Sequence, residues 1–358
     1  MFIRTRTFSM ILQIVIIGGL LAGCSGGKPN SDGAAPASQS AQPTVPAKTS
    51  EATVPKPASK IKKLTLQAPL GITVSAPFYY IVEKKLLSDY AEEVELVEWK
   101  SPDEMRARIT SGQADISALP TNVGVNLYNK GVDLKLINVL IWGTTHLLGP
   151  EGETFSWEGL RGKTVHVPLK GDAPDLMFRY LLMKNKIDPE KDLKIEYVSS
   201  TQELAMLTAA GRTQYSVLPE QTASIAVQQS KGVAKIMNFQ EEWGKATGKP
   251  ARVPGAGVVV SGTLAKQYPE LVQKLQQAFK ESVQYINANP KEAALMLEPH
   301  QSGLSVDFIQ KLVPALNLQF GAASDIRSEL EFYYSEMAAL SPEIIGGKLP
   351  NEAFYYAK

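Results

Sequence analysis

Along most of the chain after residue 60, segments that are typical of strands alternate with segments whose apolar residues recur at helical spacing. Short runs rich in Val, Ile and Leu predict strands at residues 64–67, 94–99 and 115–119. The segments between them, 78–87 and 102–111, have apolar residues at helical spacing. Strands that alternate with helices predict parallel βαβ units, so we expect an α/β fold.

The same pattern occurs a second time, 99 residues later. The segment SGQADISALPTN at 111–122 aligns with AGRTQYSVLPEQ at 210–221, where Gly, Ser, Leu and Pro coincide. The same offset brings Ser101 onto Ser200 and Glu104 onto Glu203. The second copy predicts strands at 164–167, 193–198 and 214–218 and helices at 175–184 and 201–210. The chain therefore predicts two similar lobes.

Two further apolar runs predict the connections between these lobes. The run 136–142 precedes Gly143 and Thr144 and should leave the first lobe, and the run 255–261 should return to it. Two antiparallel crossings would form a hinge. The remaining chain predicts helices that pack against the first lobe, at 268–287, 290–297, 305–313 and 323–340.

A cleft between the lobes is the expected binding site. Ligands of open parallel sheets bind beyond the carboxyl ends of the strands. In the first lobe the loops at these ends are 71–77 and 120–122, and in the second lobe they are 170–174 and 219–222. We expect the four loops to face one another.

The N-terminus has the pattern of a secretory signal. Arg4 and Arg6 precede an apolar run at 8–21, which is shorter than the roughly 20 residues of a membrane-spanning helix. The run ends in Leu-Ala-Gly-Cys, which resembles a bacterial lipobox, so Cys24 is expected to be lipidated and to anchor the protein to a membrane. The alternative is a core cysteine after an ordinary signal peptide.

Composition bounds the domain organisation. Residues 25–60 are rich in Ser, Ala, Pro and Lys and predict a disordered tether, and the roughly 300 residues that follow are enough for two lobes. We expect a signal peptide at 1–23, a lipidated tether at 24–60, a first lobe from 61–146 with 256–358, and a second lobe from 147–255. Without residues 1–23, 35 basic residues face 36 acidic ones, which does not favour nucleic acid binding.

The body of the chain resembles the type II periplasmic binding proteins of the nitrate/sulfonate/taurine class, which also contains thiamine-precursor and riboflavin binders. The resemblance depends on the helix start Ala76-Pro77-Phe78-Tyr79, the motif SGQAD at 111–115, the motif LRGKTV at 160–165, and the segment 269–290. It implies an extracytoplasmic, monomeric solute-binding subunit of an ABC importer, whose partners are a permease and its ATPase. It also implies two lobes, each a mainly parallel sheet flanked by helices, joined by a two-strand hinge.

The resemblance places ligand contacts in the four loops and at the first crossing. The residues that it carries over are Ser75, Ala76, Pro77, Tyr79, Thr121, Asn122, Trp142, Thr144, Gly171, Asp172, Ala173, Glu220 and Gln221. Each of them could instead serve as a helix cap or a turn residue.

The chemistry of these loops leaves the ligand open between two kinds. The predicted helix starts at Pro77 and Pro174, with Lys170 nearby, favour an anionic group such as a sulfonate. Asp172 and Glu220 oppose an anion, and aromatic residues such as Tyr79 could stack on a ring. We expect a small polar organic molecule, either a sulfonate-like anion or a heteroaromatic compound.

Two other functions remain open, an enzyme on the same fold and a ligand sensor. Lyases and a pyrimidine-precursor synthase share the fold class, so the fold alone does not decide the function. Of the three histidines, His146, His166 and His300, only His146 lies near the expected site. No zinc or nucleophile motif is present, and we expect neither a metal nor a cofactor.

Overall fold

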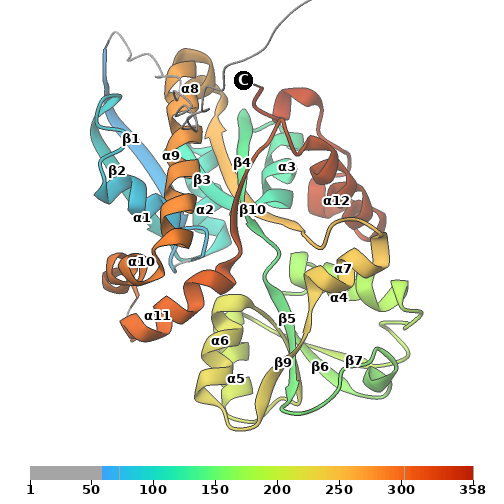
Figure 1. Ribbon diagram of the computed structural model, residues 1–358. Helices are drawn as coiled ribbons and strands as arrows, with labels where there is room; N and C mark the ends of the chain where they lie inside the picture. Colours follow the sequence, from blue (N-terminus) through green and yellow to red (C-terminus); the bar gives the residue numbers. More distant parts are fainter. Residues whose placement is uncertain (1–58, 72, 302, 358) are drawn as a thin grey trace, which may run out of the picture. The chain divides into compact units, whose positions relative to one another are not determined.

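The computed structural model describes residues 59–71, 73–301 and 303–357, and these residues form one compact unit (Figure 1). The predicted signal peptide, Cys24 and nearly all of the predicted tether lie outside the described residues. The described chain is a mixed α/β fold with two sheets flanked by helices, as predicted.

Sheet A contains six strands in the order β11-β4-β10-β3-β1-β2. Strand β1 pairs in parallel with β2 and β3, whereas β10 is antiparallel to its neighbours β3 and β4. The bounds are β1 Ile61–Pro69, β2 Ala91–Trp99, β3 Ile116–Pro120, β4 Leu134–Trp142, β10 Pro254–Ser261 and β11 Leu318–Ala322.

Sheet B contains five strands in the order β7-β6-β8-β5-β9. Strand β6 pairs in parallel with β7 and β8, and β5 is antiparallel to β8 and β9. The bounds are β5 Thr145–Pro150, β6 Thr164–Pro168, β7 Lys194–Val198, β8 Tyr215–Pro219 and β9 Val233–Asn238. Each sheet thus holds three parallel strands from one copy of the repeat. In each sheet an antiparallel strand from a crossing pairs with the third of these strands, β10 with β3 and β5 with β8. This shared arrangement confirms the repeat.

Helices cover both sheets (Figure 1). We call sheet A with α1–α3 and α8–α11 lobe A, and sheet B with α4–α7 lobe B. Their bounds are α1 Ala76–Glu83, α2 Pro102–Thr110, α3 Thr121–Asn129, α4 Ala173–Lys184, α5 Thr201–Ala209, α6 Glu220–Gln229, α7 Phe239–Thr247, α8 Gly262–Gln267, α9 Pro269–Ala288, α10 Pro290–Leu297 and α11 Val306–Leu312. Helix α12, Arg327–Leu340, follows β11.

The repeat extends to the helix caps. The Ser101 hydroxyl accepts a hydrogen bond from the backbone N–H of Glu104 at 3.2 Å, and Ser200 accepts one from Glu203 at 3.1 Å. Both serines satisfy an N–H group that has no partner within its helix. The caps fix the starts of α2 and α5 at the residues where the sequence predicts them.

Helix α12 connects the two lobes. It contacts β10 of lobe A and α4 of lobe B, where the Tyr180 hydroxyl donates to Glu336 Oε2 at 2.6 Å. The Phe332 ring lies 5.7 Å from the Trp243 ring of α7. The tail helices α9 and α10 pack on lobe A as expected, with Phe279 against Phe78, but α12 also buries apolar surface on lobe B.

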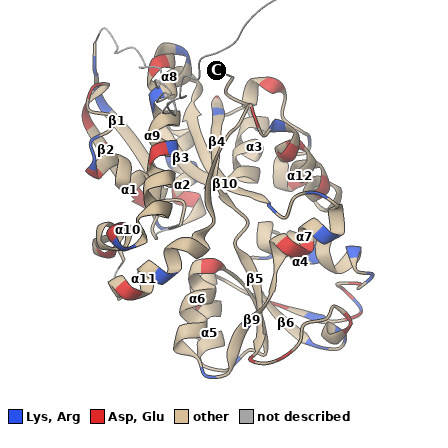
Figure 2. Ribbon diagram, in the orientation of Figure 1, with Lys and Arg blue, Asp and Glu red and all other residues tan. Residues whose placement is uncertain are grey.

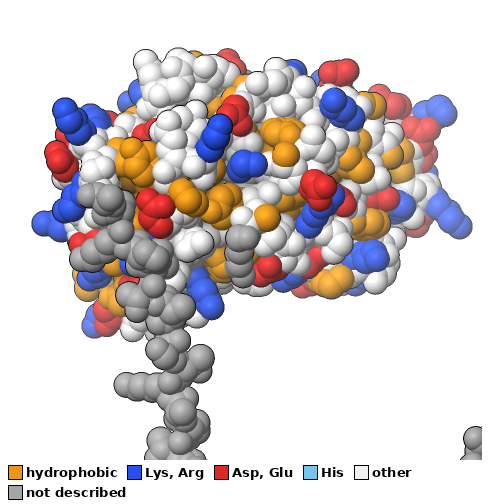
Figure 3. All heavy atoms as spheres, turned by 90° about the horizontal axis from the view of Figure 1, so that it is seen from above, with side chains coloured by type: hydrophobic (Ala, Val, Ile, Leu, Met, Phe, Trp, Pro, Cys, Tyr) orange, Lys and Arg blue, Asp and Glu red, His pale blue; other side chains and the backbone are white. Residues whose placement is uncertain are grey.

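The surface carries charges of both signs. Lys, Arg, Asp and Glu are distributed over the helices and loops of both lobes (Figure 2). On the face drawn in Figure 3, acidic and basic side chains are interspersed with apolar ones. In the described part of the chain, every helix is too short or too polar to cross a bilayer.

Candidate ligand-binding cleft

A cavity of about 250 Å³ lies between the two lobes, beyond the carboxyl ends of the strands. Lobe A contributes Thr73, Val74, Pro120, Ile141 and Ala256. Lobe B contributes Ala173, Pro174, Met177, Pro219 and Phe239. A hollow of about 330 Å³ lies instead near the amino ends of β3 and β4, where Asp115 and Asp133 border it. We assign the site to the first cavity, because both repeats contribute to it at equivalent loops.

The two crossings form the floor of this cavity. Gly143, Thr144 and Thr145 line it from the first crossing, and Val253 and Gly255 line it from the second. The crossings run side by side, since Pro254 pairs with Trp142. Gly143 has a φ of +48°, and a Cβ there would lie 2.6 Å from Gln240 Cγ, so a larger residue would push into the wall of the cavity.

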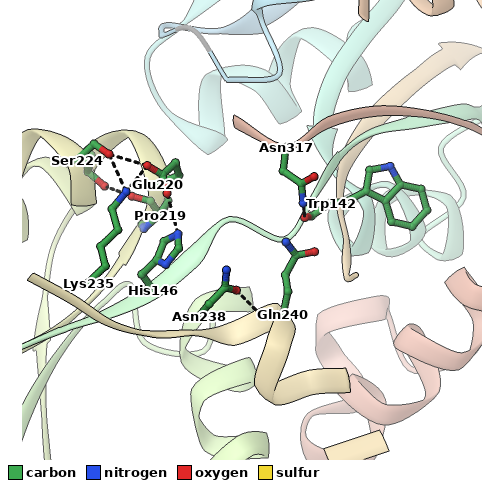
Figure 4. A network of polar contacts seen from close by, with 10 residues as sticks. Trp142, His146, Pro219, Glu220, Ser224, Lys235, Asn238, Gln240 and Asn317 are labelled. Carbon is green, nitrogen blue, oxygen red and sulfur yellow. Dashed lines mark hydrogen bonds and ion pairs between the residues drawn. The ribbon is translucent and has the colours of Figure 1, made fainter. Parts of the chain in front are cut away.

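Trp142, the last residue of β4 before the first crossing, is held in the core by several contacts. Its indole is 1 % exposed, and Nε1 donates to the Gln319 carbonyl at 2.8 Å. The Asn317 amide donates to the Trp142 carbonyl at 2.5 Å (Figure 4), and the Arg252 guanidinium lies 4.1 Å from the indole ring centre. The side chain therefore lies in the core and does not line the cavity.

The predicted contacts at the start of α1 are buried in lobe A. The Ser75 hydroxyl donates to the Pro69 carbonyl at 2.5 Å, and Ala76 and Pro77 are buried. The Tyr79 ring stacks on His300 with 3.9 Å between ring centres, and its hydroxyl donates to Glu98. Helix α1 begins two residues earlier than predicted, so these residues face the lobe and the preceding Thr73 and Val74 reach the cavity.

At the second loop of lobe A, the predicted contacts belong to the first turn of α3. The Thr121 hydroxyl donates to the Pro254 carbonyl at 2.6 Å and so joins α3 to the second crossing. Asn122 is buried, and its Oδ1 has no hydrogen-bond partner among the described residues. Pro120, directly before them, lines the cavity.

The predicted contacts at the first loop of lobe B divide between surface and cavity. Gly171 and Asp172 are exposed, whereas Ala173 lines the cavity together with Thr144 of the first crossing. The Gly171 N–H donates to the buried Asp175 carboxylate at 2.8 Å, which fixes the turn before α4.

Glu220 is 2 % exposed and lies in a network of polar side chains (Figure 4). Its carboxylate accepts a hydrogen bond from Ser224 at 2.5 Å, lies 2.7 Å from His146 Nε2, and pairs with Lys235. Burial alone would raise the pKa of this carboxyl, but the hydrogen bonds from His146, Lys235 and Ser224 hold the pKa below its ordinary value. Since its oxygens have these partners, Glu220 supports the start of α6.

Gln221 forms a contact between the lobes. Its Nε2 donates to Gln301 Oε1 of the tail at 3.1 Å, and a Cβ at Gly71 would lie 3.2 Å from its Oε1. On the opposite side of the cleft, α12 connects the lobes. The two lobes are therefore in contact on both sides of the cleft.

Four polar residues that line the cavity were not predicted as contacts. Thr73 and Thr145 lie in or beside loops that were predicted, whereas Gln240 and Tyr333 do not. Gln240 is the second residue of α7, and its Oε1 accepts a hydrogen bond from the Val253 N–H at 3.3 Å. Tyr333 reaches the cavity from α12 and is 3 % exposed. Neither belongs to a motif, and Tyr333 comes from a helix whose spacing indicates only a packed tail. Within the described residues, no three acidic, His or Cys side chains gather closely enough to hold a metal ion.

Comparison with known proteins gives a family and a fold. The family model that matches, described as menaquinone biosynthesis, covers residues 75–335. A candidate binding protein of Bacillus subtilis (strain 168), YtlA, is 23 % identical over 256 residues, which are 70 % of this chain and 74 % of YtlA.

Solved structures show the same fold at low sequence identity. An ABC transporter structure from Parabacteroides distasonis has a TM-score of 0.68 and 22 % identity, and the match covers 84 % of this chain and all of that one. The periplasmic aliphatic sulphonate binding protein SsuA of Escherichia coli has a TM-score of 0.64 and 14 % identity, over 84 % of this chain and 93 % of SsuA. These likenesses confirm the predicted type II periplasmic binding protein fold.

Proposed function

Because the chain belongs to the family described as menaquinone biosynthesis and has the two-lobed fold of ABC-type binding proteins, we propose that it is the solute-binding subunit of an ABC importer. It captures a small organic molecule between its lobes and delivers it to a membrane permease. The observation that carries this proposal is the cavity of about 250 Å³ between the lobes, to which both repeats and both crossings contribute.

Closure is the step by which binding would be signalled. A ligand that touches both lobes stabilises the closed state in proportion to its preference for that state over the open one. Thr73 and Pro120 on lobe A face Ala173 and Pro219 on lobe B across the cavity. A molecule held between them bridges the lobes, and the permease then meets a surface that the open form does not present.

We also propose that the chain is exported and anchored. A signal peptide at 1–23, lipidation of Cys24 and a tether to about residue 60 would hold a monomeric receptor at the outer face of a membrane. In this proposal the chain has a first domain of residues 61–146 with 256–358, which includes α12, and a second domain of residues 147–255. Helix α12 of the first domain also contacts α4 of the second, so it joins the two domains.

An enzyme is the second candidate function, and the family description favours it. Acid–base catalysis requires an ionisable group within hydrogen-bonding reach of the substrate. Among the described residues that line the cavity, Tyr333 alone has an ionisable side chain, and burial raises its pKa. Glu220 and His146 contact each other through a polar pair at 2.7 Å, and neither is among the lining residues. The cavity therefore supports binding better than it supports catalysis.

The test is a thermal-shift screen of the full chain against sulfonates, nitrate, pyrimidines, flavins and aromatic compounds, with mass spectrometry of each ligand afterwards. A ligand at 100 times its Kd should add about 2.7 kcal/mol to the free energy of unfolding. Recovery of the ligand unchanged supports the receptor. Chemical conversion of the ligand would contradict it and favour the enzyme.

Uptake measurements separate the importer from a sensor. Deletion of the gene should abolish uptake of the identified ligand, and the wild-type gene should restore it. Restoration should fail with a variant that no longer binds. Unchanged uptake in the deletion strain, with a lost transcriptional response, would favour the sensor.

A further inference from the structure

The cavity between the lobes is uncharged. The described residues that line it contribute apolar side chains, backbone, three threonine hydroxyls, the Gln240 amide and the Tyr333 phenol. No Lys, Arg, Asp, Glu or His is among them. An ionised ligand that leaves water requires a paired charge or a dense set of hydrogen bonds, and without them its burial is strongly unfavourable.

Its walls are suited to a flat apolar skeleton. Val74 and Ile141 of lobe A lie on one side, and Met177 and Phe239 of lobe B lie on the other. A cavity of about 150 Å³ lined by apolar side chains holds a benzene ring. The volume here, about 250 Å³, therefore has room for a molecule of roughly two fused rings.

Two donors of the lining residues, neither of them a fully buried atom, have no acceptor in the cavity wall. Tyr333 is 3 % exposed, and its hydroxyl has no hydrogen-bond partner among the described residues. Gln240 is 8 % exposed and uses its Oε1 to hold the Val253 N–H, while its amide nitrogen has no partner among the described residues. A ligand that fills the cavity covers both groups, and since buried polar groups are nearly always paired, it should supply an acceptor for them.

The N-termini of two neighbouring helices also favour an acceptor oxygen over a full negative charge. Helix α3 begins after Pro120, which lines the cavity; it has no side-chain cap and no acid in its first turn. Helix α6 begins after Pro219 and carries Glu220 in its first turn. An acceptor oxygen is thus favoured on the α3 side, whereas the Glu220 carboxylate offsets the positive end of α6 and weakens the attraction for a full anion.

We propose that the ligand of this cleft is an uncharged ring compound of about two fused rings that carries a carbonyl or similar acceptor oxygen, bound by the Tyr333 hydroxyl and the Gln240 amide. This inference rests on the proposed function, because it names the substrate class of the same cleft. Of the two ligand kinds that the sequence leaves open, it selects the ring compound over the sulfonate-like anion.

The test uses three probes of similar size on the full chain: 1-tetralone, tetralin, which lacks its oxygen, and naphthalene-1-sulfonate, which is an anion. By titration calorimetry, the wild type should bind 1-tetralone at least ten times more tightly than the sulfonate. It should also bind 1-tetralone several times more tightly than tetralin, because only the ketone accepts a hydrogen bond.

Two tyrosine variants test the donor. Tyr333→Phe should reduce the preference for 1-tetralone over tetralin by roughly fivefold, the value of one net hydrogen bond. Tyr334→Phe is the matched control, since Tyr334 is the next residue of the same helix, is buried and does not line the cavity. It should leave the preference unchanged. Thermal unfolding without ligand establishes that both variants are folded.

The outcomes separate this inference from the proposed function. Tighter binding of naphthalene-1-sulfonate, or no binding of 1-tetralone, overturns the substrate class, and an anion recovered unchanged still supports a receptor. A preference for 1-tetralone that Tyr333→Phe leaves intact overturns the donor assignment. Conversion of bound 1-tetralone to a product supports the substrate class and contradicts the receptor.

Discussion

At the scale of single residues, Glu220 shows how a buried charge is stabilised. The negative charge of its carboxylate is paired with Lys235, and His146 and Ser224 are within hydrogen-bonding distance of its oxygens. Glu220→Gln removes the negative charge and leaves Lys235, whose side chain is 27 % exposed, without its counter-charge. We expect a loss of roughly 2–4 kcal/mol in the free energy of unfolding at pH 7, measured by urea denaturation.

The control for this variant is Glu93→Gln. Glu93 pairs with Lys63 at 3.2 Å, but both side chains are about half exposed. An exposed pair contributes less than about 1 kcal/mol, so the control should unfold near the wild-type urea midpoint. Equal losses for the two variants would contradict the role assigned to the Glu220 network.

The same network predicts a dependence on pH. The pKa of the Glu220 carboxyl is lower in the folded chain than the ordinary value of 4.5. Its contribution is therefore fully present above about pH 5 and is lost as the pH falls through the folded pKa. The stability difference between wild type and Glu220→Gln should be largest near neutral pH and should shrink below about pH 4. A difference that stays constant from pH 7 to pH 3 would argue against this sign.

Gly143 is a second residue where the local geometry decides the outcome. Gly143→Ala places a Cβ 2.6 Å from Gln240 Cγ in a left-handed conformation. We expect a loss of about 2 kcal/mol or more, together with weaker ligand binding, because Gln240 must move. Gly112→Ala separates the two causes, since Gly112 has a φ of +71° and open space around its Cβ position. It should lose about 1 kcal/mol from the conformation alone. Equal losses for Gly143→Ala and Gly112→Ala in urea denaturation would show that the collision with Gln240 does not contribute.

At the scale of helices and strands, the paired caps of α2 and α5 make a quantitative prediction. Ser101→Ala and Ser200→Ala should each cost about 1 kcal/mol, because each leaves a backbone N–H without its acceptor. The serines belong to different lobes, so the double variant should lose the sum within about 0.5 kcal/mol. Ser111→Ala, at the other end of α2, should change the urea midpoint little. If the double variant lost no more free energy of unfolding than either single variant, the two caps would not be independent.

Most strands and helices could be predicted because their signals are local. The strand at 64–67 lies within β1, and the helix at 290–297 matches α10 at both ends. Helices α3 and α6 were not predicted, and their first residues were assigned to the loops 120–122 and 219–222, because each helix begins directly after a strand that ends in proline, without a capping side chain. Strands β5, β9 and β11 were not predicted; they complete sheets through partners distant in the sequence.

The candidate site was less predictable than the fold. Of the residues predicted as contacts, Thr144 and Ala173 line the cavity, whereas Ser75 and Tyr79 face the interior of lobe A. A sequence pattern locates a loop, but the direction of each side chain depends on the residue where the following helix begins. Gln240 and Tyr333 reach the cavity only because α7 and α12 pack together, and nothing in their local sequence indicates it.

At the scale of the whole molecule, the two sides of the cleft differ. On one side, α12 joins the lobes through apolar packing and the Tyr180–Glu336 hydrogen bond. On the other side, the contact includes the polar Gln221–Gln301 hydrogen bond. We therefore expect the cleft to open at the glutamine contact while the α12 side acts as the joint.

Gln301→Ala tests this asymmetry. The loss of one hydrogen bond across the cleft should lower the population of the closed state and weaken ligand binding about three- to tenfold. The radius of gyration without ligand, from small-angle X-ray scattering, should increase. Gln228→Ala, an exposed glutamine on α6, is the control and should change neither quantity. Wild-type affinity in Gln301→Ala would show that this contact does not hold the cleft closed.

The position of β10 in sheet A has a consequence for the order of folding during synthesis. Strand β10 lies between β3 and β4 but is made more than 100 residues after them, whereas the strands of sheet B are contiguous in the chain. Lobe B can therefore assemble while the chain is still being made, and β3 and β4 must wait for their shared neighbour. A nascent chain that stops before Pro254 should hold a folded lobe B beside an incomplete lobe A, with the cavity not yet formed.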